Sequence, residues 1–158
     1  MIDDDFLGAQ YEILRWLSTG TSPARGIRVE RLACIEAGRS GGPYLPAAQR
    51  ERRFVEDLAR GAGIEVITPD EPNRPNVFDL IQHGEADLLH FVGHGEFSSH
   101  HPEDSKIFLI DGASLSARQL QGPVLQKVRE KRPLVFFNAC STGQQGWALT
   151  GPIGWVQT

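Results

Sequence analysis

Hydrophobic residues follow two alternating patterns along the chain: short apolar runs, and longer stretches in which apolar residues recur every three or four positions. The short runs predict strands at residues 29–37, 64–68, 87–92, 106–110 and 134–137. The helical spacing predicts helices at residues 2–18, 47–61, 77–84, 114–120 and 124–132. Because strands and helices alternate, the sequence predicts an α/β fold with three layers and a mainly parallel sheet.

Some of these elements have predicted details that a structure can test. The runs over 87–92 and 134–137 are almost wholly apolar, as expected for strands covered on both faces of a sheet. Asn76 is expected to cap the helix that follows it, and that helix should end near Gly84. In the helix over 47–61, the residues expected to face the core are Phe54, Val55 and Leu58.

The predicted elements form one domain that follows a separate helix. Residues 1–27 supply the N-terminal helix and a linker, and residues 28–158 supply the α/β domain. The segment after Gly146 has the pattern of a helix start, with no further strand behind it. A sheet that stopped there would leave an open edge, so we expect the domain to be truncated at its C-terminal end.

Composition narrows the class of protein. The 16 Lys and Arg residues against 20 Asp and Glu residues give a formal charge of −4, which argues against a nucleic-acid partner. No apolar run approaches the roughly 20 residues that span a bilayer, and the acidic N-terminus is unlike a signal peptide, so no membrane partner is expected. Two cysteines without a CxxC motif exclude a disulfide scaffold and indicate a reducing cytoplasm.

Two of the predicted strands end in polar loops that carry reactive side chains. The run over 87–92 leads to His94 between two glycines, and the run over 134–137 leads to Cys140. Ligands of open α/β sheets sit beyond the carboxyl ends of the strands, so neighbouring strands would place His94 beside Cys140. An imidazole can help to form a reactive thiolate, and backbone N–H groups near the glycines and Cys140 can bind an oxyanion.

The other candidate residues have simpler interpretations. Cys34 lies inside a strand run and is expected to pack as a small apolar side chain. His90 lies mid-strand and is expected to be a core histidine with a partner. On a strand, His90 and His94 would lie about 13 Å apart, too far to share a metal ion. Neither of the usual phosphate-binding glycine motifs is present, so the sequence gives little support for a nucleotide site.

The motifs together resemble the CHAT domain of the caspase-like (clan CD) cysteine peptidases, a relative of caspases and separases. Leu89 to Phe97 is similar to the family pattern LHFxGHGxF, and Leu134 to Gly143 is similar to LVxLxACxTG. Ile107 to Gly112 and the following Leu115-Ser116-Ala117 resemble the strand, DG turn and helix start between those motifs. The segment Leu45 to Ala48 with Glu51 resembles LPGAxxE. The resemblance covers roughly residue 28 to the end.

This resemblance implies a caspase-like sandwich and a cysteine endopeptidase. It implies His94 as the base, Cys140 as the nucleophile that forms a thioester, and the N–H groups of Gly95 and Cys140 as the oxyanion hole. It requires no metal or organic cofactor, and it implies a protein or peptide substrate and an effector role in a larger bacterial protein with regulatory or sensor partners. The supporting loop residues would be Asn138, Ser141, Thr142 and Gly143, with Asn138 standing where many relatives have Ser.

Two alternatives stay open at this point. The first is a catalytically silent caspase-like scaffold for protein–protein interaction, since a fold can outlive its chemistry. The second is a flavodoxin-like nucleotide-binding domain, which shares the α/β pattern and would bind its ligand at Ser141 to Gly143. The presence of both His94 and Cys140 favours the enzyme, because a scaffold needs neither.

Overall fold

The computed structural model describes most of the chain between residue 26 and residue 153. The described residues are 26, 28–37, 45–101, 104–139, 146–148 and 151–153. The helix predicted over 2–18 lies outside them. Among these residues, no helix is long and apolar enough to cross a bilayer.

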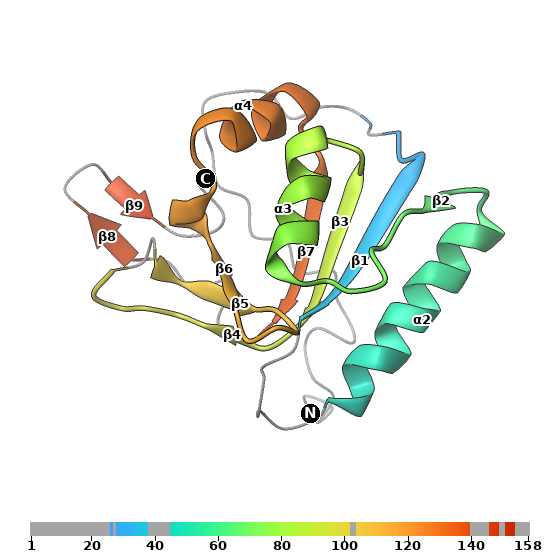
Figure 1. Ribbon diagram of the computed structural model, residues 1–158, viewed down its shortest axis with the longest axis horizontal. Helices are drawn as coiled ribbons and strands as arrows, with labels where there is room; N and C mark the ends of the chain where they lie inside the picture. The colour runs from blue at the N-terminus through green and yellow to red at the C-terminus, as the bar shows by residue number, and fades with distance from the viewer. Residues whose placement is uncertain are drawn as a thin grey trace, which may run out of the picture.

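Four parallel strands form the central sheet (Figure 1). They are β1 (Arg31–Ala37), β2 (Glu65–Val66), β3 (Leu88–Gly93) and β7 (Leu134–Ala139). Their order is β2-β1-β3-β7, so β3 lies between β1 and β7. The apolar runs over 87–92 and 134–137, which predicted buried strands, therefore form β3 inside the sheet and β7 at its edge.

Helices cover the two faces of this sheet and make the predicted three layers. Helix α2 (Pro46–Gly61) packs on one face, over β1, β2 and β3. Helices α3 (Arg74–His83) and α4 (Gly122–Lys131) lie on the opposite face, where they pack against each other (Figure 1). The fold predicted from the alternation of strands and helices is confirmed.

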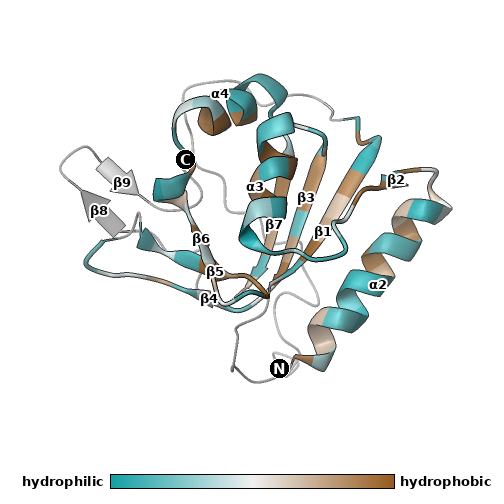
Figure 2. Ribbon diagram, viewed as in Figure 1, coloured by the Kyte–Doolittle hydropathy of each residue, from teal (hydrophilic) through white to brown (hydrophobic). Residues whose placement is uncertain are grey.

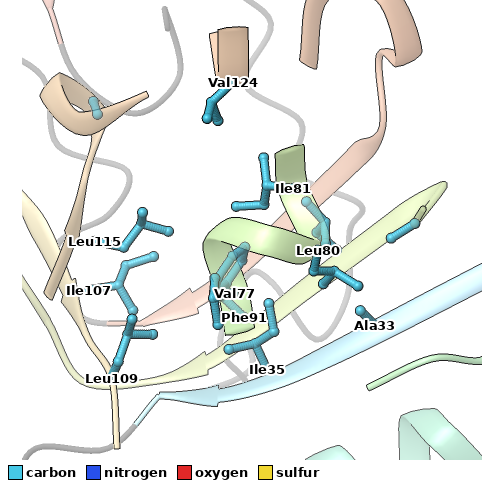
Figure 3. Packing of buried hydrophobic residues seen from close by; sticks show 13 residues of the cluster. Ala33, Ile35, Val77, Leu80, Ile81, Phe91, Ile107, Leu109, Leu115 and Val124 are labelled. Carbon is cyan, nitrogen blue, oxygen red and sulfur yellow. The ribbon is translucent and has the colours of Figure 1, made fainter. Parts of the chain in front are cut away.

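The main hydrophobic core lies between the sheet and helices α3 and α4. Its sheet-side residues alternate along the strands, as they must when successive side chains point to opposite faces. Figure 3 shows this packing, with Phe91 and Ile35 below the helix and Val77, Leu80 and Ile81 above them. In Figure 2 the apolar colour is concentrated on β1, β3 and β7, whereas α2 is mostly hydrophilic.

Helix α3 begins at a different cap from the predicted one. Asn73, not Asn76, is the N-cap, and its side-chain oxygen accepts a hydrogen bond of 3.0 Å from the Asn76 N–H. Pro75 is compatible with this start because a first-turn N–H has no helical partner to lose. The predicted end is confirmed, since Gly84 adopts a left-handed conformation with φ 62°.

A second, antiparallel sheet follows β3. Its strands are β4 (Gly95–Glu96), β5 (Lys106–Phe108) and β6 (Ser114–Ser116), in the order β4-β5-β6. The Asp111-Gly112 turn connects the last two, as predicted. The helix expected over 114–120 was wrong in its first half, because residues 114–116 pair with β5 and only Ala117–Gln119 form a 3-10 turn.

The C-terminal part of the chain also differs from its prediction. Strands β8 (Gly146–Ala148) and β9 (Gly151–Ile153) pair antiparallel, where the sequence pattern had suggested the start of a helix. Glycines and a proline occupy this stretch, and these residues favour turns and short strand ends over a helix interior. The predicted truncation of the domain stays a prediction.

Two predictions about side-chain burial were wrong. On α2, Phe54 is 68% exposed and Leu58 is 63% exposed, while Val55 packs inward as predicted. The buried stripe instead consists of Ala48, Glu56 and Ala59, whose size or pairing allows the helix to lie close to β1. On β7, the expected cover on both faces is incomplete, because α2 packs over the other strands and leaves Phe136 53% exposed.

Candidate active site

The carboxyl ends of β3 and β7 lie side by side at one edge of the sheet. The two strands pair in register from Leu88 with Leu134 to Gly93 with Ala139. His94 directly follows the first strand, and Cys140 directly follows the second. The structure thus brings together the two strand ends that carry the predicted dyad. Cys140 itself lies outside the described residues, as do the predicted loop residues Ser141, Thr142 and Gly143.

Backbone contacts on both sides fix the place of His94. Gly93 has φ 151°, a conformation that residues with a side chain rarely adopt, so the chain can turn out of β3 only at a glycine. The carbonyl of His94 accepts a 3.1 Å hydrogen bond from the N–H of Phe108. Gly95 then begins β4 and pairs with Ile107. His94 is half-buried between the two sheets, and the oxyanion role of Gly95 stays a prediction.

A group of three polar residues lies just below this edge, and we call it the Glu51 cluster: Glu51, His90 and Asn138. Glu51 comes from α2, His90 from β3 and Asn138 from β7. Glu51 Oε1 lies 2.9 Å from His90 Nε2, and Glu51 Oε2 accepts a 2.6 Å hydrogen bond from Asn138 Nδ2. Asn138 was expected to support the loop, and its bond to α2 was not foreseen.

Aromatic rings pack on both sides of the β3–β7 pair. His90 stacks on Phe136, with ring centroids 4.9 Å apart and planes 8° from parallel. Phe91 stacks on Phe137 on the opposite face, with centroids 5.2 Å apart. His90 is 7% exposed and has a hydrogen-bond partner, so its prediction as a core histidine is confirmed.

Cys34 is confirmed as a packing residue. Its side chain is fully buried beside Ala48 and Val92. Burial raises the pKa of the Cys34 thiol to about 12, and the negative charge of Glu56 acts in the same direction. A thiol with so high a pKa forms almost no thiolate at neutral pH and is unreactive.

Ion pairs on α2 surround this buried thiol. Arg52 donates to Glu56 at 2.9 Å, and Arg60 approaches the second Glu56 oxygen at 3.3 Å. Burial acts to raise the pKa of Glu56, but the hydrogen bond and charge of Arg52 outweigh it, so the pKa lies below its usual value. No group of three or more metal-ligating side chains occurs within the described ranges.

Comparison with known families identifies the family of this chain. A family model described as the CHAT domain matches residues 4–152. The chain belongs to the CHAT domain family. The CHAT domain is related to the caspase-like clan CD domains, and its parallel sheet with helices on both faces agrees with that fold. The match to the CHAT domain includes residues 4–27, and the predicted boundary at residue 28 stays a prediction. A search of curated proteins finds no match.

Proposed function

We propose that this CHAT domain is a cysteine endopeptidase in which His94 activates Cys140. One observation carries the proposal: β3 and β7 are adjacent, parallel and aligned at their carboxyl ends, where Gly93 pairs with Ala139. His94 is the next residue after β3, and Cys140 is the next residue after β7. A base and a thiol on the ends of neighbouring strands are the two groups that thiol-based acyl transfer needs.

The proposed reaction proceeds in two stages. The imidazole of His94 takes the proton of the Cys140 thiol, and the sulfur attacks the carbonyl carbon of the scissile peptide bond. The N–H groups of Gly95 and Cys140 stabilise the oxyanion of the tetrahedral intermediate. Collapse breaks the C–N bond, and the protonated His94 donates its proton to the leaving amine.

Water completes the reaction. His94 takes a proton from a water molecule, and the resulting hydroxide attacks the thioester carbonyl. The C–S bond then breaks, releasing a carboxylic acid product, and the sulfur recovers a proton from His94. The substrate is a protein or peptide, and the domain acts as the effector part of a larger regulatory protein.

Selective alkylation tests the proposal on the full chain. Iodoacetamide should label Cys140 quickly near neutral pH and leave Cys34 unlabelled in the folded protein, with the labelled peptide identified by mass spectrometry. His94→Ala should slow the labelling of Cys140 about tenfold or more and move its pH midpoint toward the roughly 8.5 of a free thiol.

Cys140→Ala provides the matching functional control. It should abolish cleavage of a substrate that the wild-type protein processes, while Cys34→Ala should preserve cleavage. Cleavage that survives Cys140→Ala would overturn the proposal. Labelling of Cys140 at the rate of an ordinary free thiol, unchanged by His94→Ala, would favour the silent scaffold.

A further inference from the structure

The carboxylate of Glu51 connects three secondary-structure elements through its two oxygens. One oxygen lies 2.9 Å from His90 Nε2 on β3, and the other accepts a 2.6 Å hydrogen bond from Asn138 Nδ2 on β7. A carboxylate only accepts, so in this arrangement His90 donates through Nε2 and Asn138 donates through its amide. A single side chain of α2 therefore links the two strands that precede the proposed dyad.

The cluster lies close to the reactive end of both strands. Asn138 precedes Cys140 by two residues in the sequence, and His90 precedes His94 by four. Within β7, which ends at Ala139, Asn138 is the last side chain on the face toward α2. A shift of β7 along β3 would break the Asn138 bond and displace the strand end that leads to Cys140 relative to the one that leads to His94.

The surroundings of His90 make its bond to Glu51 costly to lose, whereas Asn138 and its bond to Glu51 are exposed to solvent. His90 is buried between Glu51 and the ring of Phe136, and Glu51 is only 28% exposed at its side chain. A buried polar group that loses its partner keeps the full desolvation cost. On the same face, Phe136 is half exposed, so apolar packing holds this part of β7 less firmly than it holds β3.

We propose that Glu51 is a positioning residue, which acts through Asn138 and His90 to hold Cys140 in register with His94. This inference rests on the proposed function, because it assigns Glu51 a task in assembling that dyad. The carboxylate of Glu51 contacts His90 and Asn138. Its contribution is to set the distance and orientation between thiol and imidazole, on which general-base efficiency depends.

An exchange of donor and acceptor tests the contact without changing the size of the side chains. Asn138→Asp replaces the amide donor with a second carboxylate beside Glu51, so the bond becomes a repulsion. Adding Glu51→Gln restores it in reverse: the glutamine amide donates to the introduced carboxylate, and its carbonyl oxygen still accepts from His90. Gln126→Glu is the matched control, since Gln126 donates to Glu130 on the exposed face of α4.

The measurements are the rate of Cys140 alkylation, its pH midpoint and the melting temperature of each variant. Asn138→Asp should slow alkylation at pH 7 about tenfold and raise the midpoint, and the double variant should recover to within about threefold of wild type. Gln126→Glu should change neither the alkylation rate nor its pH midpoint. A purely structural role for Glu51 would lower the melting temperature while leaving the pH midpoint of the folded protein unchanged.

The outcomes separate this inference from the proposed function. If His94→Ala leaves Cys140 alkylation unchanged, the dyad itself is absent. If His94→Ala slows alkylation but Asn138→Asp does not, the positioning role of Glu51 is overturned. Failure of the double variant to recover would also overturn it. If Asn138→Asp does not fold, Glu51→Gln alone decides: it removes one of the two acceptors and should slow alkylation about threefold.

Discussion

The two faces of the central sheet are held by different chemistry, although the same strands supply both. On the α3–α4 face, Phe91 of β3 stacks on Phe137 of β7 within an apolar core. One residue earlier on each strand and on the opposite face, His90 stacks on Phe136. There the partner helix brings a carboxylate, Glu51, where α3 brings aliphatic side chains.

This difference between the faces suggests that one face supplies most of the stability of the fold and the other sets the positions of the strand ends. Burial of apolar surface stabilises the fold strongly, but it has no direction and tolerates small shifts. Hydrogen bonds between fixed donors and acceptors contribute less free energy and specify one arrangement. We therefore expect the α3–α4 face to determine how stable the domain is, and the α2 face to determine how its strand ends are arranged.

The largest effect on stability should follow from truncation on the apolar face. Phe91 is 2% exposed, and Phe91→Ala should lower the free energy of unfolding by about 3–5 kcal/mol because it leaves a cavity between the sheet and α3. Urea denaturation followed by circular dichroism measures this loss. Phe91→Leu, which keeps most of the volume, should cost under about 2 kcal/mol. A small loss for Phe91→Ala would contradict the assignment of stability to this face.

A smaller and pH-dependent effect is expected for Glu56 on the opposite face. Glu56→Gln should destabilise the protein by about 1–2 kcal/mol at pH 7, because the charged hydrogen bonds to Arg52 and Arg60 are weakened. The pKa of Glu56 is lowered in the folded protein, so the unfolded chain takes up the proton first as the pH falls. The contribution is present above roughly pH 4.5 and is lost as the pH falls through the folded pKa.

Denaturation curves of wild type and Glu56→Gln at pH 7 and at about pH 3 check this sign. The difference between the two proteins should shrink at the lower pH. A difference that stayed constant, or grew on acidification, would show that the charge of Glu56 does not stabilise the folded state.

Phe136 and Phe91 each belong to a stacked ring pair, one on each face of the sheet, so their substitutions compare the two faces directly. Phe136→Ala should cost about 1 kcal/mol, well below Phe91→Ala, because Phe136 is already half exposed and loses mainly its contact with His90. The same urea titration measures both variants. Equal losses for the two would show that the faces contribute alike.

The smallest effect is expected on the outer side of α2. Phe54→Ala should change the free energy of unfolding by no more than about 0.5 kcal/mol, because the ring is mostly exposed and alanine is a good helix former. Its neighbour Val55 packs inward, so Val55→Ala should cost about 1–2 kcal/mol and serves as the control. A larger loss of unfolding free energy for Phe54→Ala than for Val55→Ala would instead support the inward placement of Phe54 that the sequence predicted.

Much of the sheet was predictable because its signals are local. The apolar runs that became β3 and β7, the Asp111-Gly112 turn and the inert Cys34 can each be identified from a few neighbouring residues. The N-cap of α3 was not, because Asn73 and Asn76 both lie within four residues of Val77, the first apolar residue of the helix, and only the structure shows which side chain accepts the bond.

The polar side of the site could not be predicted from the pattern alone. Glu51 lies 39 residues from His90 and 87 from Asn138 along the chain, and no local rule connects residues so far apart. One signal did exist, since a histidine in the middle of a buried strand needs a hydrogen-bond partner. It predicted that a partner exists without indicating which residue supplies it.

The register between β3 and β7 also bears on how the domain folds. Every residue of β3 pairs with one 46 positions further along, so the second sheet and α4 lie inside a loop that must close before this ladder can form. Closing long loops carries an entropy cost, and topologies rich in distant pairings fold slowly. The β1–β3 ladder closes a loop that is longer still, because Leu32 pairs with Leu88, 56 positions further along. A chain in which β7 has not yet paired with β3 contains His94 without its proposed partner in place, so the proposed activity would appear only once that ladder has formed.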